Sequence, residues 1–122
     1  NNGMARMTHR TVYIAGPMTG LPEHNYPAFN AAADHYRAQG HTVHNPAENT
    51  PTVRIDTMTW TDWVRLGIAQ LVQCDTIVML DGWSRSNGAC LEIHIARSLN
   101  MRIRYQDPTH YGTGYPSLGG TP

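Results

Sequence analysis

The sequence predicts an α/β protein in which helices cover both faces of a mainly parallel β-sheet. Short apolar or β-branched segments alternate with segments of helical periodicity in the order βαβαβαβ, and no internal repeat interrupts that order. Strands that alternate with helices favour right-handed crossovers and hence a parallel sheet. We therefore expect a three-layer, flavodoxin-like or Rossmann-like sandwich with a sheet of four or five strands.

The first half of the chain contains two predicted strands, one helix and a long loop. Residues 11–16 are β-branched and aromatic, which predicts the first and central strand. Apolar residues recur at helical spacing over residues 27–39, and Gly40 follows as a left-handed helix stop. A short strand is expected over residues 41–45. Residues 46–58 show no periodicity and predict a loop long enough to serve as a lid.

The second half of the chain contains two more helices and two more strands. The first of these helices begins near residue 60, where Thr59 or Thr61 supplies the amino-terminal cap. On it, Trp60 and Trp63 are interpreted as core or subunit-interface anchors rather than as base-stacking platforms. In chain order the elements are a helix over residues 60–73, a buried strand over 76–80, a helix over 89–99 and a last strand over 101–105.

The length and composition indicate one globular domain. The chain has 122 residues, of which 40% are apolar and 15% charged, and this is enough for a single core. Nine basic residues balance nine acidic ones, so no net field attracts a nucleic-acid polymer or anionic lipid. No apolar run approaches the roughly 20 residues of a membrane span, and no signal-peptide core is evident. We expect a cytoplasmic protein.

The two chain ends are expected to lie outside that domain. Asn1-Asn2-Gly3 is interpreted as an expression remnant, with Met4 or Met7 as the natural start. The far end is rich in Gly and Pro and should be extended unless a neighbouring subunit holds it. The predicted organisation is a leader over residues 1–10, a domain over 11–106 and a tail over 107–122.

Neither the cysteines nor the histidines predict a metal site. Cys74 and Cys90 form no CxxC motif, so both are interpreted as buried small hydrophobic residues. His24, His44 and His94 lack metal-ligand spacing, and a polar surface or a core hydrogen bond explains each of them better. We expect no metal ion and no cofactor.

The predicted topology indicates where a ligand would bind. In parallel sheets ligands bind beyond the carboxyl ends of the strands, here in the loops over residues 16–23, 45–56 and 81–88. The last loop runs into a helix amino terminus, where free N–H groups and the helix dipole favour an anion such as phosphate, although ordinary helix capping explains the same residues. The candidate substrate-binding residues are Gly16, Pro17, Met18, Asn45, Trp83, Ser84, Ser86, Asn87 and Gly88.

Glu92 is the candidate catalytic carboxylate. It lies one turn inside the helix that follows the third loop, among apolar residues, and a carboxylate on the inner face would be costly without a purpose. A helix that packs by one face leaves either Glu92 or Ile93 outward, so a surface glutamate is the alternative. If it faces inward, Glu92 lies near Tyr13.

A carboxylate beside a phenol suits attack on an anomeric carbon. Glu92 could form a glycosyl ester that water or a second base later releases, with Tyr13 orienting the carboxylate. Asp81 is the candidate second carboxylate, able to protonate the leaving base or to position the sugar. Trp83 beside it offers a face for base stacking.

The residues of the opening strand and loop resemble a known family. The segment Tyr13-Ile14-Ala15-Gly16-Pro17-Met18-Thr19-Gly20, with Asn25, Pro27, Phe29 and Asn30, resembles the opening of nucleoside 2-deoxyribosyltransferase-like proteins. The match extends from about residue 11 to 105 and is strongest to a short branch common in phages and prophages. The residues that match this branch further along the chain are Gly40, Val43, Asn45-Pro46, Cys74-Asp75, Leu80, Gly82-Trp83, Ser86, Gly88-Ala89, Glu92 and Ala96.

The resemblance implies a flavodoxin-like fold, a homodimer or higher homo-oligomer, and chemistry at the bond between a nucleobase and a (deoxy)ribose. It implies that Glu92 is the nucleophile with Tyr13 beside it, and that Ser86 and Gly88 bind a 5′-phosphate. Related nucleotide hydrolases are N-glycosidases of nucleoside monophosphates, so hydrolysis of a (deoxy)nucleoside 5′-monophosphate is expected. Base exchange and non-catalytic nucleotide binding, as in a sensor or a sequestering module, are the alternatives. A phage-encoded chain would act in the host cytoplasm.

Gly67 departs from the family pattern. Relatives commonly carry an aspartate at this position, about eight residues before the Cys-Asp pair, where it assists the sugar or the base. The resemblance therefore implies either that Asp62 or Asp81 takes over this duty, or that the site binds nucleotide without turnover.

Overall fold

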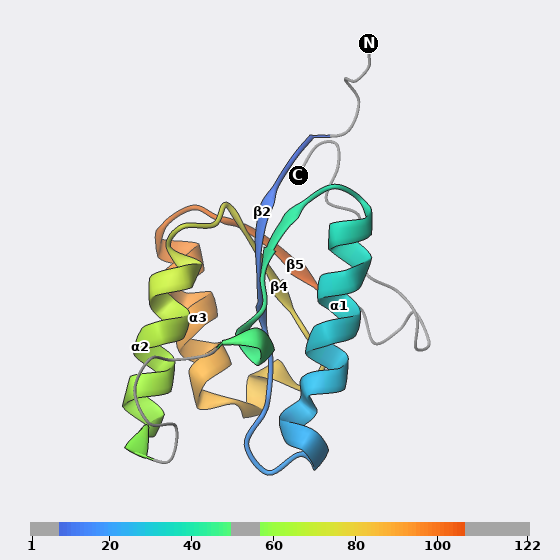
Figure 1. Cartoon of the computed structure of the whole chain (residues 1–122). Coiled ribbons are helices and arrows are strands. Elements are labelled where there is room, and N and C mark those ends of the chain that lie inside the picture. The colour runs from blue at the N-terminus through green and yellow to red at the C-terminus, as the bar shows by residue number, and fades with distance from the viewer. Residues whose placement is uncertain (1–7, 50–56, 107–122) are drawn as a thin grey trace.

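The computed structural model describes residues 8–49 and 57–106, and within them the chain forms a four-stranded parallel sheet. The predicted tail and most of the predicted leader therefore lie outside the described residues. The strand order is β3-β2-β4-β5, so the first described strand lies inside the sheet (Figure 1). The strands are β2 (Thr11–Ala15), β3 (Thr42–His44), β4 (Thr76–Met79) and β5 (Arg102–Tyr105).

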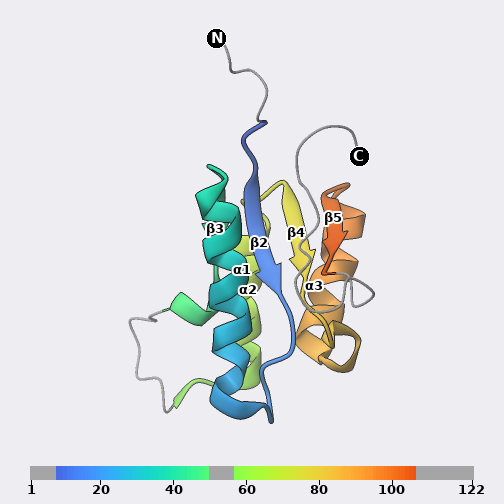
Figure 2. The same ribbon diagram turned by 90° about the vertical axis from the view of Figure 1, so that its right-hand side faces the viewer.

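Helices cover both faces of the sheet, which completes the predicted three-layer α/β sandwich. Helix α1 packs on one face, and α2 and α3 lie side by side on the other (Figures 1 and 2). Short 3-10 helices occupy the described parts of the loops after β2, β3 and β4. The helices are α1 (Tyr26–Ala38), α2 (Trp60–Leu71) and α3 (Asn87–Ser98), and the 3-10 helices are η1 (Pro22–Asn25), η2 (Pro46–Glu48) and η4 (Trp83–Arg85).

The predicted helices and strands are confirmed, with small shifts at their ends. The predicted loop over residues 46–58 begins with η2, and its residues 50–56 lie outside the described residues. Helix α2 ends at Leu71 rather than at residue 73, and α3 begins at Asn87 rather than at residue 89 because Ser86 caps it. Thr59 caps α2 in a reciprocal capping box with Asp62. Gly40 follows α1 with a φ of +91°, the left-handed stop that the sequence predicted.

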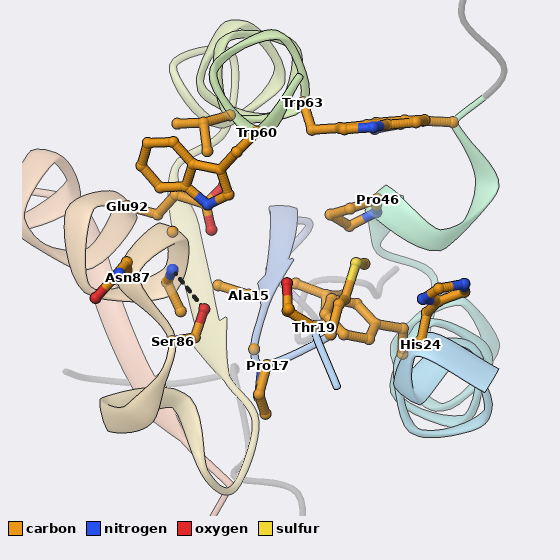
Figure 3. A pocket seen from close by; sticks show the side chains of 18 of the residues that line it. Ala15, Pro17, Thr19, His24, Pro46, Trp60, Trp63, Ser86, Asn87 and Glu92 are labelled. Carbon is orange, nitrogen blue, oxygen red and sulfur yellow. Dashed lines mark hydrogen bonds between the residues drawn. The ribbon is translucent and has the colours of Figure 1, made fainter. Parts of the chain in front are cut away.

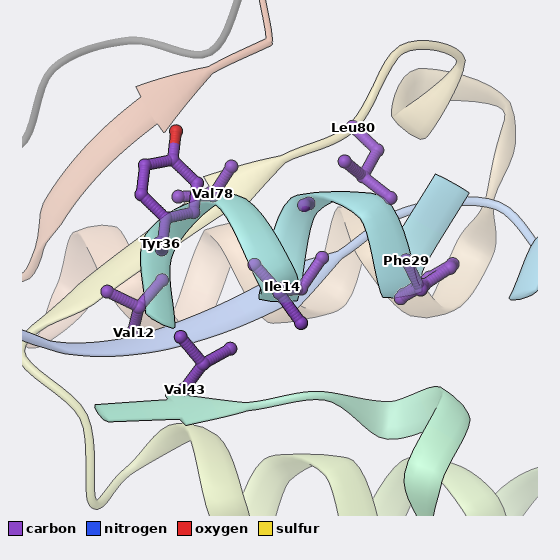
Figure 4. Close-up of a cluster of buried hydrophobic side chains, with 9 residues drawn as sticks. Val12, Ile14, Phe29, Tyr36, Val43, Val78 and Leu80 are labelled. Atoms are coloured by element: carbon purple, nitrogen blue, oxygen red, sulfur yellow. The ribbon is translucent and has the colours of Figure 1, made fainter. Parts of the chain in front are cut away.

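Strand β2 is buried on both faces and divides the core into two clusters. Val12 and Ile14 point toward α1, where they pack with Phe29 and Tyr36 (Figure 4). Because side chains alternate along a strand, Tyr13 points the other way, into the cluster under α2 and α3. Tyr13 therefore faces the layer that contains Glu92.

The strand order creates a crevice at one end of the sheet. From β2 the chain crosses over to β3 on one side, and β4 lies on the other side of β2. Connections that leave neighbouring strands in opposite directions open a crevice at their carboxyl ends, the usual ligand site of open parallel sheets. No helix in the described parts of the chain has the length and apolar character needed to cross a membrane.

Truncation of Ile77 on β4 tests the packing of the cluster under α2 and α3. Ile77 is fully buried, so Ile77→Ala is expected to lower the free energy of unfolding by about 2–5 kcal/mol, through lost burial and the cavity left behind. Urea denaturation measures this change. The control, Val72→Ala, removes a side chain that is 53% exposed and should shift stability by less than about 0.5 kcal/mol. Equal effects of the two variants would contradict the assigned core.

Candidate functional site

A cavity of about 680 Å³ lies at the carboxyl end of β2, in the crevice predicted from the topology. Its walls come from the loop after β2, the exposed side of α2, the start of η2 and the first turns of α3 (Figure 3). This volume is within the range of small-molecule sites, roughly 300–1,000 Å³. The cavity therefore has room for a ligand of nucleotide size.

A buried hydrogen bond between Tyr13 and Glu92 forms the inner wall of this cavity. The Tyr13 hydroxyl donates to Oε2 of Glu92 at 2.6 Å, from the central strand to the second turn of α3. Tyr13 is 1% exposed and Glu92 is 8% exposed, yet both line the cavity. Glu92 thus faces inward, and the alternative of a surface glutamate is excluded.

Glu92 and Ile93 are both buried, whereas packing by a single face would leave one of them outward. Ile93 is 2% exposed and belongs to the apolar cluster against the sheet. Helix α3 also contacts α2, so it is covered along two sides. The second contact allows a carboxylate to be enclosed without displacing the apolar face of the helix.

Burial controls the protonation of the Tyr13–Glu92 pair. Removal from water raises the pKa of Glu92 to about 7, although the hydrogen bond from Tyr13 opposes this shift. Burial and the neighbouring carboxylate raise the pKa of the Tyr13 phenol well above its usual value. Glu92 can therefore gain or lose a proton near neutral pH, as acid–base and nucleophilic groups in enzymes do.

Gly67 brings α2 into direct contact with the pair. A Cβ atom built at this position would lie 2.6 Å from the Tyr13 hydroxyl oxygen and 2.8 Å from Oε2 of Glu92. Both separations are shorter than van der Waals contact allows, so no side chain fits beside the pair as it stands. The glycine that departs from the family pattern is thus a steric requirement of this arrangement.

Neither of the two carboxylates that could take over from the missing aspartate lies beside Gly67. Asp62 is exposed at the start of α2, where it accepts the Thr59 N–H in the capping box. Asp81 is exposed after β4, and its backbone N–H bonds the side chain of Gln106. Neither residue lines the cavity. Glu92 is therefore the carboxylate that the described residues contribute to the cavity lining.

The amino terminus of α3 forms a polar wall of the cavity. Ser86 is the N-cap residue, and its Oγ accepts the N–H of Ala89 at 3.1 Å. Asn87 and Gly88 follow it and also line the cavity. The first N–H groups of the helix and its dipole lie beside this wall, and both attract negative charge. Ser86 thus caps the helix and lines the cavity, so the two interpretations of this loop are compatible.

The structure brings most of the predicted site residues together, but not all of them. Three predicted residues lie elsewhere in addition to Asp81. Trp83 packs against Tyr105 at a ring separation of 6.0 Å, and Asn45 is buried with its side chain bonded to Ala47, Asn30 and Glu48. Ser84 is exposed outside the lining. The predicted residues on the cavity wall are Tyr13, Gly16, Pro17, Met18, Ser86, Asn87, Gly88 and Glu92.

Other cavity residues were not predicted as site residues. Trp60 and Trp63 line the cavity, and Trp60 is 55% exposed, so Trp60 is not a core residue, whereas its role as a subunit-interface anchor stays a prediction. Helical spacing could have located them, because residues 60, 63 and 67 fall on one stripe of α2. His24 and Arg85 also line the cavity. The described residues contain no cluster of three or more His, Cys, Asp or Glu side chains suited to a metal ion.

Replacement of Glu92 by glutamine tests the raised pKa. The folded state holds a proton on Glu92 up to about pH 7, whereas an ordinary glutamate loses it near 4.5, so Glu92 destabilises the fold as pH rises through this window. Glu92→Gln should therefore be more stable than the parent at pH 8, by on the order of 3 kcal/mol, and equal to it near pH 4.

Urea midpoints of both proteins at pH 4 and pH 8 measure this difference. Glu48→Gln is a control of opposite sign, because hydrogen bonding from Arg37 lowers the pKa of Glu48 and its charge stabilises the fold above that pKa. A parent that is at least as stable as Glu92→Gln at pH 8 would refute the raised pKa.

A methyl group at position 67 tests the close approach of α2. Alanine favours helices over glycine by about 1 kcal/mol, yet Gly67→Ala should lower the free energy of unfolding by about 1–3 kcal/mol because the methyl group displaces the pair. Ala69→Gly, at an exposed position of the same helix, calibrates the propensity effect alone. Increased stability of Gly67→Ala would show that the approach is looser than described.

Comparison with known proteins gives a family and a fold. A family model described as a domain of unknown function, DUF4406, matches residues 10–105. No curated protein sequence matches the chain. Among solved structures, a 2-desoxiribosyltransferase from Leishmania mexicana has a TM-score of 0.60 at 19% sequence identity, with 90% of this chain and 80% of that chain covered.

These two matches agree with the resemblance found in the sequence motifs. The family model spans nearly all of the predicted domain, and the structural match covers 90% of this chain. At 19% identity the structural likeness concerns the fold. The chain therefore belongs to the DUF4406 family and has the fold of a 2-deoxyribosyltransferase.

Proposed function

We propose that this protein cleaves the N-glycosidic bond of a (deoxy)nucleoside 5′-monophosphate and releases the free base. The observation that carries the proposal is the Tyr13–Glu92 hydrogen bond on the inner wall of a ligand-sized cavity, beside a helix amino terminus. The fold shared with a 2-deoxyribosyltransferase supports the same class of bond. A homodimer or higher homo-oligomer is part of this proposal, and sedimentation velocity would test it.

Glu92 is the nucleophile in the proposed reaction. Its Oε2 accepts the hydrogen bond from the Tyr13 hydroxyl, so Oε1 remains free to attack the anomeric carbon. The new bond joins Oε1 to C1′, and the C1′–N bond breaks with its electron pair on the base. Water then attacks C1′, the ester bond breaks, and the sugar phosphate leaves. Tyr13 keeps the carboxylate oriented through both steps.

The polar wall at α3 supports a phosphate as the anchoring group. Ser86, Asn87 and Gly88 surround the first N–H groups of the helix, and Glu92 lies one turn further along. A 5′-phosphate at this terminus would place the sugar next to Glu92, because the terminus and the carboxylate belong to the same helix. This arrangement favours a nucleotide over a nucleoside.

The aromatic wall at α2 supports a base as the leaving group. Trp60 and Trp63 line the cavity, together with Met18 from the loop after β2. Indole rings offer flat apolar faces on which a base stacks, a contact worth about 1–3 kcal/mol per base. The cavity thus offers separate surfaces for the phosphate, the sugar and the base.

Two other reactions follow from the same cavity and are separated by their products. If a second base replaces water as the acceptor, the glycosyl ester gives base exchange. If Gly67 leaves the pair without the help that relatives obtain from an aspartate, the protein binds nucleotide intact, as a sensor or a sequestering module would. Product chromatography distinguishes free base, exchanged nucleotide and unchanged nucleotide.

Incubation with a panel of ribo- and deoxyribonucleoside monophosphates tests the proposal. The wild type should release free base from at least one nucleotide, and Glu92→Ala should reduce release by several orders of magnitude because the nucleophile is lost. Asp34→Ala, at an exposed position of α1 outside the cavity lining, is the control and should keep full activity. Absence of base release from every nucleotide would refute hydrolysis, and thermal stabilisation with intact ligand would favour the sensor.

A further inference from the structure

His24 lies across the cavity from the catalytic pair. It comes from η1, after the first strand, and lines the cavity on the side away from Ser86 and Glu92 (Figure 3). Its ring packs against the Tyr26 ring at 5.5 Å, and within the described residues no hydrogen bond engages its ring nitrogens. An imidazole therefore faces the space that the aromatic wall also borders.

An unusual backbone presents this imidazole. Glu23, His24 and Asn25 have φ values of 51°, 54° and 61°, so three consecutive non-glycine residues adopt the left-handed conformation. Such residues persist only where the surrounding structure holds them, and they concentrate at functional sites. Here Asn25 Nδ2 donates to the Pro17 carbonyl at 2.9 Å, which ties the turn to the loop after β2.

The proposed reaction needs an acid on this side of the cavity. Cleavage of the C1′–N bond leaves an electron pair on the base, and a proton donor at the base lowers that barrier. Asp81 lies outside the cavity, and Gly67 has no side chain. The Tyr13 hydroxyl already donates its hydrogen bond to Glu92. Arg85 also lines the cavity, but a guanidinium does not release its proton.

The expected pose of a nucleotide directs its base toward His24. With the phosphate at the start of α3 and C1′ at Glu92, the base extends toward the opposite wall, where Trp63 and His24 lie (Figure 3). Histidine is also the side chain that most readily exchanges a proton near neutral pH. The position of His24 and the chemistry of its imidazole therefore both suit a proton donor to the base.

We propose that His24 is the general acid that protonates the departing base, an inference that rests on the proposed function. As Glu92 Oε1 bonds to C1′, the C1′–N electron pair passes to the base, and the imidazolium of His24 donates its proton to a base nitrogen. In the second step, neutral His24 takes a proton from the water that attacks C1′, and Glu92 leaves as a carboxylate. The cycle consumes one nucleotide and one water and restores both side chains.

Leaving-group dependence tests this assignment. His24→Asn keeps a residue that tolerates left-handed backbone but cannot donate the proton, and Glu23→Asn makes the same change at the neighbouring position outside the cavity lining. On the nucleotide that the wild type cleaves fastest, His24→Asn should lose about 10²–10⁴-fold in kcat with KM little changed, and Glu23→Asn should lose nothing. Equal urea midpoints would confirm that both variants fold.

A cationic nucleotide separates acid catalysis from positioning. The bases of 7-methylguanosine 5′-monophosphate and nicotinamide mononucleotide leave as neutral molecules and need no proton. In a single turnover, His24→Asn should therefore release the base from whichever of these the wild type accepts at close to the wild-type rate, because only the later attack of water uses His24 as a base. A loss below tenfold on the ordinary nucleotide, or an equal loss on both kinds of nucleotide, would overturn the role of His24 while leaving Glu92 in place. A wild type that cleaves no nucleotide would overturn both proposals.

Discussion

The hydrogen bond between Tyr13 and Glu92 is the constraint around which the other parts of the site are arranged. It joins residues 79 positions apart at a 2.6 Å separation, beside an apolar cluster under α2 and α3. A carboxylate can be enclosed there because a phenol donates to one oxygen while the other remains available. The same contact restricts position 67, because a side chain there would require the ends of Tyr13 and Glu92 to shift.

The layers of the fold were predictable because they depend on local periodicity. The β-branched residues of β2 predict a strand, and the helical spacing of apolar residues predicts α1. A glycine with positive φ follows α1 where the sequence predicted the helix to end. The inward direction of Glu92 was harder, since it follows from the packing of α3 against α2 as well as against the sheet. The apolar stripe of α3 shows that one side of the helix packs, but it does not show that α2 covers a second side.

The site residues that the sequence misplaced are those whose positions depend on turns. Gly82 adopts a φ of +86° immediately after Asp81 and redirects the chain, so that Trp83 packs against Tyr105 and not against the cavity. His24 was missed for a similar reason, because its left-handed backbone has no glycine to signal it. Proximity to β4 or β2 in sequence was therefore insufficient to predict which loop side chains reach the cavity.

The distribution of the tryptophans has a practical consequence. The chain has three of them, and the structure places Trp60 and Trp63 on the cavity wall while Trp83 packs against Tyr105 outside it. Two indoles thus lie where a stacked ligand would quench their emission, and the third is shielded from that contact. A ligand that stacks on Trp60 or Trp63 would therefore change the tryptophan emission of the chain, and a titration could follow that change without an attached dye.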